Sequence, residues 1–335
     1  MRTIERARCV VCGSSGAVRY RGLVDRLFSS PGEWSISECS NDACGTLWLD
    51  PAPLPDDLGE AYRDYFTHER YGLPRLSRAK RAYLESTYGT GKPRSLSDRL
   101  LAGIFALRYR RKLEADDQIC HIDIEDGLKV LDIGCGDGRT LWTLKQLGCE
   151  ATGVEFDGEA AATARKLGLD VRLGSLDEQG FAAATFDAIL MSHVIEHLPD
   201  PKATLVECLR ILKPGGQLRM LTPNAGAWGH GHFGRDWMAL DPPRHLNIFT
   251  PPGMTSLLRS AGFSDVVVGS TPSGADRIAV MSRRIRRTGR GGIMERFEWL
   301  EKRYGRAMLV VERLVNANGR GRGSQLVVKA SKPSG

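Results

Sequence analysis

The sequence of 335 residues contains no apolar run of about 18 residues, the length that a membrane-spanning helix requires. Its first residues, MRTIERARC, are positively charged, but no apolar segment of the kind found in secretory signals follows them. We therefore expect no transmembrane segment and a cytoplasmic location, where thiols stay reduced. The eight cysteines are then expected to be metal ligands or core residues and not disulfides.

The glycine-rich stretch VLDIGCGDGRT (130–140) lacks the lysine of a phosphate-binding loop and the third glycine of the dinucleotide pattern GxGxxG. Its three glycines alternate directly behind an apolar run, a pattern that lets a ligand approach the backbone closely. Glu155 ends the next strand-like segment, where a carboxylate can accept hydrogen bonds from two ribose hydroxyls. These residues predict a site for an adenine nucleoside without choosing between NAD and S-adenosylmethionine.

Four segments are expected along the chain. Residues 1–56 form a cysteine-containing module, and residues 57–126 are mostly helical, with one helix expected over 96–117. From 127 to 275, strands alternate with helices, which predicts a doubly wound, mostly parallel α/β sheet. Asp157 and Thr250 are expected to cap two of these helices. Residues 276–335 read as a basic, partly helical insertion followed by one more strand.

Two later stretches, FDAILMSHVIEHLPDP (186–201) and LRILKPGGQLRMLTPN (209–224), have no role in the NAD pattern. Together with VLDIGCGDG they closely resemble the class I S-adenosylmethionine-dependent methyltransferases, over roughly residues 128–270. This resemblance implies a seven-stranded Rossmann-like sheet and an enzyme that uses S-adenosylmethionine.

The resemblance also assigns residues to the cofactor. Asp132 and its neighbouring glycines would cradle the methionine part, Glu155 the ribose and Phe156 the adenine, while Ser192 and His193 would lie under the sulfonium. Many relatives carry an aspartate after the third strand; here either Ser175 or Asp177 takes its place. The full expected cofactor set is Asp132, Gly134, Cys135, Gly136, Gly138, Glu155, Phe156, Ser175, Leu176, Ser192 and His193.

Two cysteine pairs, CVVCG and CSNDACG, lie near the N-terminus. Four thiolates in two close pairs suit a tetrahedral, structural zinc ion, although the second pair is wider than usual. The alternative is four unrelated core residues. The module also resembles the N-terminal region of bacterial methyltransferases found among sugar- and polysaccharide-modifying enzymes. This resemblance implies a small zinc-ribbon-like unit. The expected ligands are Cys9, Cys12, Cys39 and Cys44.

Residues 229–250, GHGHFGRDWMALDPPRHLNIFT, resemble a segment of the same methyltransferase group that shapes the acceptor pocket. His245 is the candidate general base, because a neutral imidazole can remove a hydroxyl proton near pH 7. Asp241 and Arg244 are expected to hold a polar or anionic acceptor, and Trp237 to pack against it. The alternative is a loop held by its own ion pair, hydrogen bonds and apolar anchor.

The expected activity is O-methylation of a sugar, glycan precursor or other small polar metabolite. The formal net charge of +7 and the zinc module also suit a ribosomal or transfer RNA methyltransferase, and a non-catalytic binding protein is a third hypothesis. The stretch LLAGIFALRYRRK (100–112) suggests either a helix packed on the core or an interfacial helix that contacts a membrane.

Overall fold

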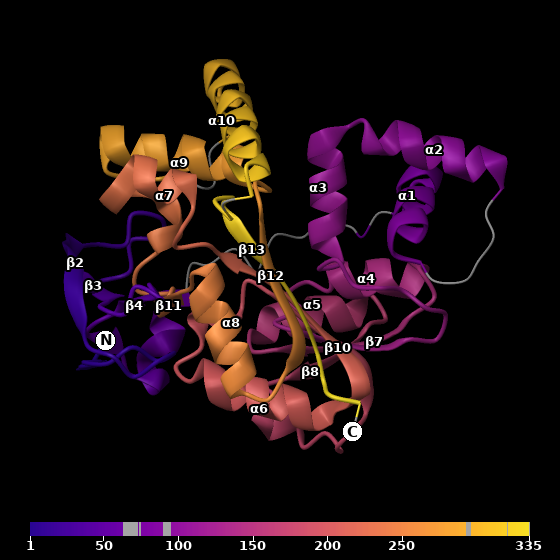
Figure 1. Ribbon diagram of the computed structural model, residues 1–335, viewed down its shortest axis with the longest axis horizontal. Helices are drawn as coiled ribbons and strands as arrows, with labels where there is room; N and C mark the ends of the chain where they lie inside the picture. Colours follow the sequence, from indigo (N-terminus) through magenta and orange to yellow (C-terminus); the bar gives the residue numbers. More distant parts are fainter. Residues whose placement is uncertain (63–72, 74, 90–94, 293–295, 320, 335) are drawn as a thin grey trace.

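The computed structural model of the chain describes all residues except 63–72, 74, 90–94, 293–295, 320 and 335. Its main sheet has seven strands in the order β12-β13-β10-β9-β6-β7-β8, and only β13 runs antiparallel to its neighbours (Figure 1). The expected α/β sheet is thereby confirmed. The strands are β6 (Lys129–Ile133), β7 (Glu150–Glu155), β8 (Asp170–Leu173), β9 (Phe186–Ser192), β10 (Leu212–Pro223), β12 (Ser264–Thr271) and β13 (Gln325–Ser331).

Strand β6 lies between β7 and β9, so the strand order reverses at its carboxyl end. In open parallel sheets, ligands bind at such a reversal. Because β13 is antiparallel, it begins at the same edge at which β9 and β10 end, and Gln325 pairs with Pro223 there. The carboxyl edge of the sheet therefore gathers the ends of β6, β7, β9, β10 and β12 and the start of β13.

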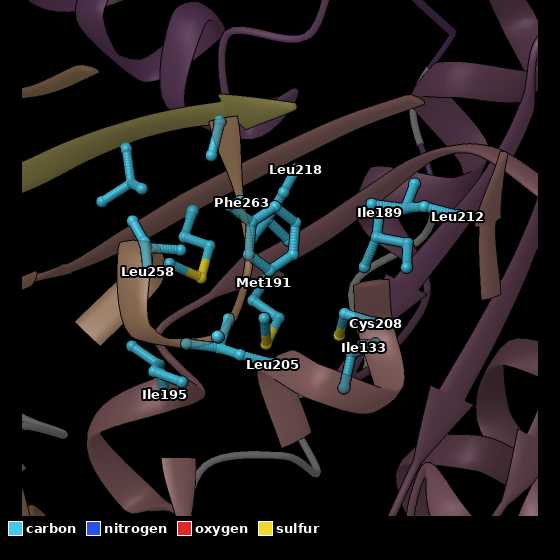
Figure 2. Packing of buried hydrophobic residues seen from close by; sticks show 14 of the residues in the cluster. Ile133, Ile189, Met191, Ile195, Leu205, Cys208, Leu212, Leu218, Leu258 and Phe263 are labelled. Carbon is cyan, nitrogen blue, oxygen red and sulfur yellow. The ribbon is translucent and has the colours of Figure 1, made fainter. Parts of the chain in front are cut away.

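Helices cover both faces of the sheet because successive strand residues point to opposite sides. In β9, Ile189 and Met191 pack with α6 (Pro201–Ile211) and α8 (Pro251–Ser260), as Figure 2 shows. Ala188 and Leu190 face the opposite layer. That layer contains α1 (Arg78–Tyr88), α2 (Leu96–Ala106), α3 (Tyr109–Gln118) and α4 (Arg139–Gln146), while α5 (Gly158–Lys166) packs on β7 and β8.

Helix capping follows the expectation at both positions. The Asp157 side chain accepts hydrogen bonds from two backbone N–H groups of α5, and the Thr250 hydroxyl accepts one from Gly253. The single helix expected over 96–117 is wrong, because Arg108 has a non-helical backbone (φ −84°, ψ 72°) that separates α2 from α3.

Helix α2 buries Ala102 and Phe105 but leaves an apolar stripe uncovered. The stripe residues are 48–84% exposed and follow helical spacing: Leu96, Leu100, Ile104 and Leu107. One face of α2 thus packs on the core, as one interpretation of this stretch expects, while membrane contact by the exposed face stays a prediction. Within the described residues, no helix is both long and apolar enough to cross a membrane.

The N-terminal module is a second, four-stranded sheet with the order β11-β4-β3-β2. Strand β11 (Asn247–Ile248) comes from the loop that follows β10 of the main sheet, so the two units share a segment. The other strands are β2 (Gly16–Leu23), β3 (Trp34–Cys39) and β4 (Leu47–Leu49), and a short pair is formed by β1 (Thr3–Ile4) and β5 (Ala52–Pro53). A 3₁₀ turn over Pro55–Tyr62 leads out of the module.

The buried guanidinium of Arg244 joins the module to the core. It donates two hydrogen bonds of 2.8 Å to Asp25 of the module, three to the carboxylate of Asp241 of its own loop and one of 3.1 Å to the carbonyl of Ala61. The side chains of Arg244 and Asp25 are both completely buried. Burial alone would raise the pKa of Asp25, but the ion pair with Arg244 outweighs it and holds that pKa well below its usual range.

The C-terminal region forms α7 (Trp228–Phe233), α9 (Ala275–Thr288) and α10 (Trp299–Ala317), which lie above the module and the sheet edge in Figure 1. Arginines of the basic 283–292 stretch are used within the fold. Arg284 pairs with Glu301 of α10 at 2.7 Å, and Arg286 pairs with Asp236 at 3.4 Å. Part of the basic character of this region therefore holds its own helices together.

We predict that Asp25→Ala destabilises the folded chain by roughly 3–5 kcal/mol, because it leaves the buried Arg244 charge without one of its partners. Denaturant unfolding followed by tryptophan fluorescence measures the loss. The matched control is Glu38→Ala, which removes the part-exposed Arg19–Glu38 pair and is expected to cost under about 1 kcal/mol. Equal costs for both variants would contradict the structural role of Arg244.

Candidate active site

The turn after β6 has three glycines with positive φ, at Gly134 (+71°), Gly136 (+55°) and Gly138 (+83°). A Cβ on Gly134 would lie 2.5 Å from Val194, and one on Gly138 would lie 2.3 Å from Leu169. These two glycines are therefore required by the packing of the chain itself. Around Gly136, in contrast, a Cβ would meet no atom within 4 Å, so this glycine faces open space at the reversal point of the sheet.

Glu155 lies beside this open space. Its carboxylate accepts hydrogen bonds from the backbone N–H of Gly136 at 2.7 Å and from that of Asp157 at 2.8 Å. The side chain is held in one position at the end of β7, and each oxygen keeps a further lone pair. Phe156, the next residue, is 74% exposed. An anchored carboxylate beside an exposed aromatic ring is suited to an adenosine, as the sequence predicts.

Asp132 is buried near the end of β6, and its carboxyl makes no hydrogen bond to any residue that the structure describes. Burial, together with the nearby charge of Glu155, raises the pKa of Asp132 to about 8. A carboxylate in this position needs a cationic partner, because an unpaired buried charge is costly. The amino and sulfonium groups of S-adenosylmethionine meet that need, so the residues present fit this cofactor.

The remaining expected cofactor residues lie at the same edge of the sheet or in the hydrophobic packing directly behind the glycine turn. Ser192 ends β9, and Ser175 follows β8, where its backbone N–H donates to Glu178. Leu176 and Cys135 are buried in the packing behind the turn. Direct contact of these four with the cofactor stays a prediction.

His193 follows β9 directly and has a left-handed backbone, with φ +56°. Its Nδ1 lies 3.2 Å from Oε1 of Glu196, and the imidazole is 44% exposed while the Glu196 carboxylate is completely buried. The other carboxylate oxygen of Glu196 accepts a 3.0 Å hydrogen bond from Thr222. Burial lowers the pKa of His193, but the hydrogen bond and charge of Glu196 outweigh it, so the net shift is upward. The same contacts lower the pKa of Glu196 to about 2 against the effect of burial.

His245, the candidate base from the sequence, is 9% exposed. Its Nδ1 hydrogen-bonds the carbonyl of Ala239 at 2.8 Å, and its ring packs edge-on against His197 at 4.9 Å. His197 in turn contacts Tyr62 and the carbonyl of Arg244. These contacts are those of a histidine that fixes its loop, which was the alternative interpretation. A catalytic role for His245 stays a prediction without support from this geometry.

Trp237, Asp241 and Arg244 are all at most 7% exposed. The cavity beside Trp237 and Asp241 has a volume of about 20 Å³, which has room for about one water molecule and is far below the roughly 300 Å³ at which ligand pockets begin. The contacts therefore favour the ion pair and apolar anchor over acceptor binding. The physical reason is that Arg244 neutralises Asp25, a partner more than 200 positions away that the local motif does not indicate.

A larger cavity of about 250 Å³ opens between α3, the turn before α9, α10 and the start of β13. Asp117, Leu309 and Gln325 are among the residues that line this cavity. The sequence analysis did not find this cavity. Its walls come from four separate segments, although the spacing of His193 and Glu196 in HVIEH was a usable indication of their pairing.

The structure brings the four N-terminal cysteines together. The Sγ atoms are 3.7 Å apart between Cys9 and Cys44 and 3.4 Å apart between Cys12 and Cys39, and all four lie within 4.8 Å of one another. A tetrahedral zinc ion with bonds of 2.3 Å requires sulfur–sulfur distances of about 3.8 Å. The residues present therefore fit the expected metal, which would leave no open coordination position.

Comparison with known proteins agrees with this geometry. The sequence model of a methyltransferase domain family matches residues 105–268. The ubiquinone biosynthesis O-methyltransferase of Xanthomonas oryzae pv. oryzae is 33% identical over 148 residues, which cover 40% of this chain and 62% of that protein. The protein of the same name from Cereibacter sphaeroides is 31% identical over 153 residues, with coverages of 42% and 62%.

Residues 105–268, just under half of the chain, are thus similar to a methyltransferase domain. The chain spans about 62% of the length of these curated relatives, less than two thirds. A solved structure of an S-adenosylmethionine-dependent methyltransferase from Archaeoglobus fulgidus is similar with a TM-score of 0.45 and 19% identity, covering 70% of this chain and 99% of that one. The N-terminal cysteine module lies outside the part that the family matches.

We predict that the affinity for S-adenosylmethionine rises with pH up to about 8. Free Asp132 is protonated below its raised pKa of about 8 and must lose that proton to face a cation. Affinity therefore increases by at most tenfold per pH unit between pH 6 and 8, and binding releases up to one proton. Calorimetry in buffers of different ionisation enthalpy measures this release. Asp132→Asn should abolish it, and an equal release by that variant would contradict the assignment.

We also predict about one zinc ion per chain, measured by elemental analysis of the purified protein. Cys44→Ser should lower both the zinc content and the melting temperature, because it removes one ligand. Cys149→Ser is the matched control, since Cys149 is buried outside the cluster and should leave the zinc content unchanged. A zinc-free folded protein would refute the metal site.

Proposed function

We propose that the chain transfers a methyl group from S-adenosylmethionine to a hydroxyl oxygen of a small polar acceptor. The observation that carries the proposal is the arrangement at the end of β6 and β7. There, the open space at Gly136, the anchored carboxylate of Glu155 and the partnerless carboxyl of Asp132 lie together within a methyltransferase domain. The curated relatives are named O-methyltransferases, which supports oxygen as the acceptor atom.

S-adenosylmethionine, when bound, supplies a methyl group already activated by the sulfonium. The chain itself has to bind the two reactants, align them and exclude water, because alignment supplies much of the rate of such a reaction. Glu155 and Phe156 are proposed to hold the adenosine and Asp132 the positive charge. The acceptor would be a sugar, a glycan precursor or another hydroxylated metabolite, which is the finer part of the proposal.

The test is incubation of a cell extract with the protein and methyl-labelled S-adenosylmethionine, followed by mass spectrometry. We expect the label on a hydroxyl oxygen of a small molecule or glycan. Glu155→Ala should lower cofactor affinity by at least about tenfold, because two ribose hydroxyls lose a charged acceptor. Glu150→Ala, at the exposed amino end of the same strand, is the control.

Two outcomes would refute the proposal. Label found in RNA, with binding that weakens steeply as salt rises, would favour an RNA methyltransferase. Failure of the protein to bind S-adenosylmethionine at all in calorimetry would remove the enzymatic function, whichever acceptors are present.

A further inference from the structure

A second group of metal-binding side chains lies between the turn after β9 and the loop after β10. A carboxylate oxygen of Glu196 and one imidazole nitrogen each from His197 and His245 lie within 4.8 Å of one another. Glu196 and His245 are buried, and His197 is half-buried. These residues are separate from the four-cysteine cluster. Two imidazoles and a carboxylate are a ligand set that proteins use for divalent transition-metal ions.

We propose that Glu196, His197 and His245 together bind one divalent transition-metal ion. This site goes beyond the proposed methyl transfer, and its tests do not depend on any acceptor. The ion ties the turn after β9 to the loop after β10, which also carries Arg244 and is hydrogen-bonded to the N-terminal module. Three protein ligands leave at least one coordination position for water or a ligand oxygen, in contrast to a site filled by four cysteines.

The hydrogen bonds of the two histidines leave the same nitrogen free on each ring. Nδ1 of His245 lies 2.8 Å from the carbonyl oxygen of Ala239, and Nδ1 of His197 lies 3.0 Å from that of Arg244. A carbonyl oxygen only accepts hydrogen bonds, so each Nδ1 carries the proton of a neutral ring. The Tyr62 hydroxyl, 2.9 Å from Nδ1 of His197, then accepts from the same N–H. The lone pair is on Nε2, and metal-binding histidines usually have this support from a backbone carbonyl.

Neither Nε2 has a hydrogen-bond donor among the residues that the structure describes. Oδ2 of Asp241, 3.9 Å from Nε2 of His245, is itself an acceptor. Asp241 shares the guanidinium of Arg244 with Asp25, so one cation serves two carboxylates, and Glu196 adds a third buried carboxylate. Acceptors that face one another without a proton repel, most strongly where they are buried. A divalent cation removes this repulsion.

The carboxylate of Glu196 is held in place by contacts outside the proposed ligand set. One oxygen lies 3.2 Å from Nδ1 of His193, and the other accepts a 3.0 Å hydrogen bond from the hydroxyl of Thr222. Each oxygen keeps a further lone pair that can bind an ion. Such outer hydrogen bonds orient the ligands in metal sites.

Only small movements are needed to close the site around an ion. With bonds of about 2.1 Å, neighbouring ligand atoms of a tetrahedral or octahedral ion are roughly 3.0–3.4 Å apart. Because the three atoms already lie within 4.8 Å of one another, side-chain rotations that move them by less than about 2 Å are sufficient. The half-buried position of His197 gives the ion access from solvent.

The ligand types select the class of metal. Two imidazole nitrogens favour an ion such as Zn²⁺, Fe²⁺ or Co²⁺ over Mg²⁺, which prefers oxygen ligands. The site has one ligand fewer than the cysteine cluster and no thiolate, so it binds an ion more weakly. Dialysis against a mild chelator such as citrate is therefore expected to empty it and to leave zinc in the cysteine module.

The first test is the binding of Co²⁺ to the dialysed full chain, followed by calorimetry and by absorption spectroscopy. We expect about one ion per chain, with visible d–d bands and without the near-ultraviolet band that thiolate ligands give to cobalt. A thiolate band would place the ion at the cysteine module and overturn the proposal. The absence of any binding would also overturn it.

The second test removes one ligand by the change His245→Asn. The asparagine amide occupies the position of Nδ1 and keeps a donor for the carbonyl of Ala239, but it supplies no Nε2. We expect the affinity for Co²⁺ to fall more than about 100-fold, because a direct ligand is lost. The control His232→Asn changes an exposed histidine on α7 and should leave the affinity unchanged. Equal affinities of the native chain and His245→Asn would refute the ligand set.

A milder variant, Thr222→Val, tests the support of Glu196 while keeping the shape of the buried side chain. It removes the 3.0 Å hydrogen bond and should lower the affinity for Co²⁺ about 10–100-fold. Thr143→Val is the matched control, since Thr143 is also buried but lies on α4. Unchanged affinity in Thr222→Val would contradict Glu196 as a ligand.

The third test measures the melting temperature of the dialysed chain with added ions. Co²⁺ should raise the melting temperature of the native chain, because it binds the folded state, and should not raise that of His245→Asn. Mg²⁺ at the same concentration is expected to have no effect. An equal rise with Mg²⁺ would overturn the transition-metal class, and a rise with Co²⁺ that persists in His245→Asn would overturn the site.

Discussion

The buried carboxylate of Glu196 is the constraint around which the centre of this protein is arranged. A charged group with no solvent contact must be paired and hydrogen-bonded to be tolerated. Thr222 from β10 and His193 from the end of β9 satisfy its two oxygens. Its backbone carbonyl also accepts a 2.8 Å hydrogen bond from Leu246. One residue thus ties together two central strands and the loop that reaches the N-terminal module.

That loop is hydrogen-bonded to Glu196 of the main domain and also to the N-terminal module. The carbonyl of Leu246 accepts hydrogen bonds from Leu49 and Arg6 of the module, while Arg244 binds the buried carboxylate of Asp25. The module is therefore packed and hydrogen-bonded to the segment that leaves the carboxyl edge of the main sheet. The module and Glu196 are therefore connected through the backbone of Leu246.

Local patterns in the sequence were sufficient to predict much of the fold and the cofactor part of the candidate site, but not its acceptor part. The alternation of apolar segments predicted the parallel sheet, since each strand must bury residues on both faces. The glycine turn and Glu155 were found because both lie within a few residues of a strand end. The cysteine pairs were recognised for a similar reason, because the short spacing within each pair is a local property. Acceptor residues were assigned to Trp237, Asp241 and Arg244 by resemblance, and their burial depends on partners such as Asp25 that no local spacing reveals.

The sequence by itself determined the α/β sheet, the nucleoside end of the site and the two cysteine pairs, because each depends on periodicity or on neighbours along the chain. Only the tertiary structure decided the rest. It broke the helix at Arg108, left the stripe of α2 exposed and used Arg244 inside the protein. It also placed Asp117 and Gln325, more than 200 positions apart along the chain, in the wall of one cavity. Long-range pairing and burial fix these features, and neither is encoded in any single stretch of the chain.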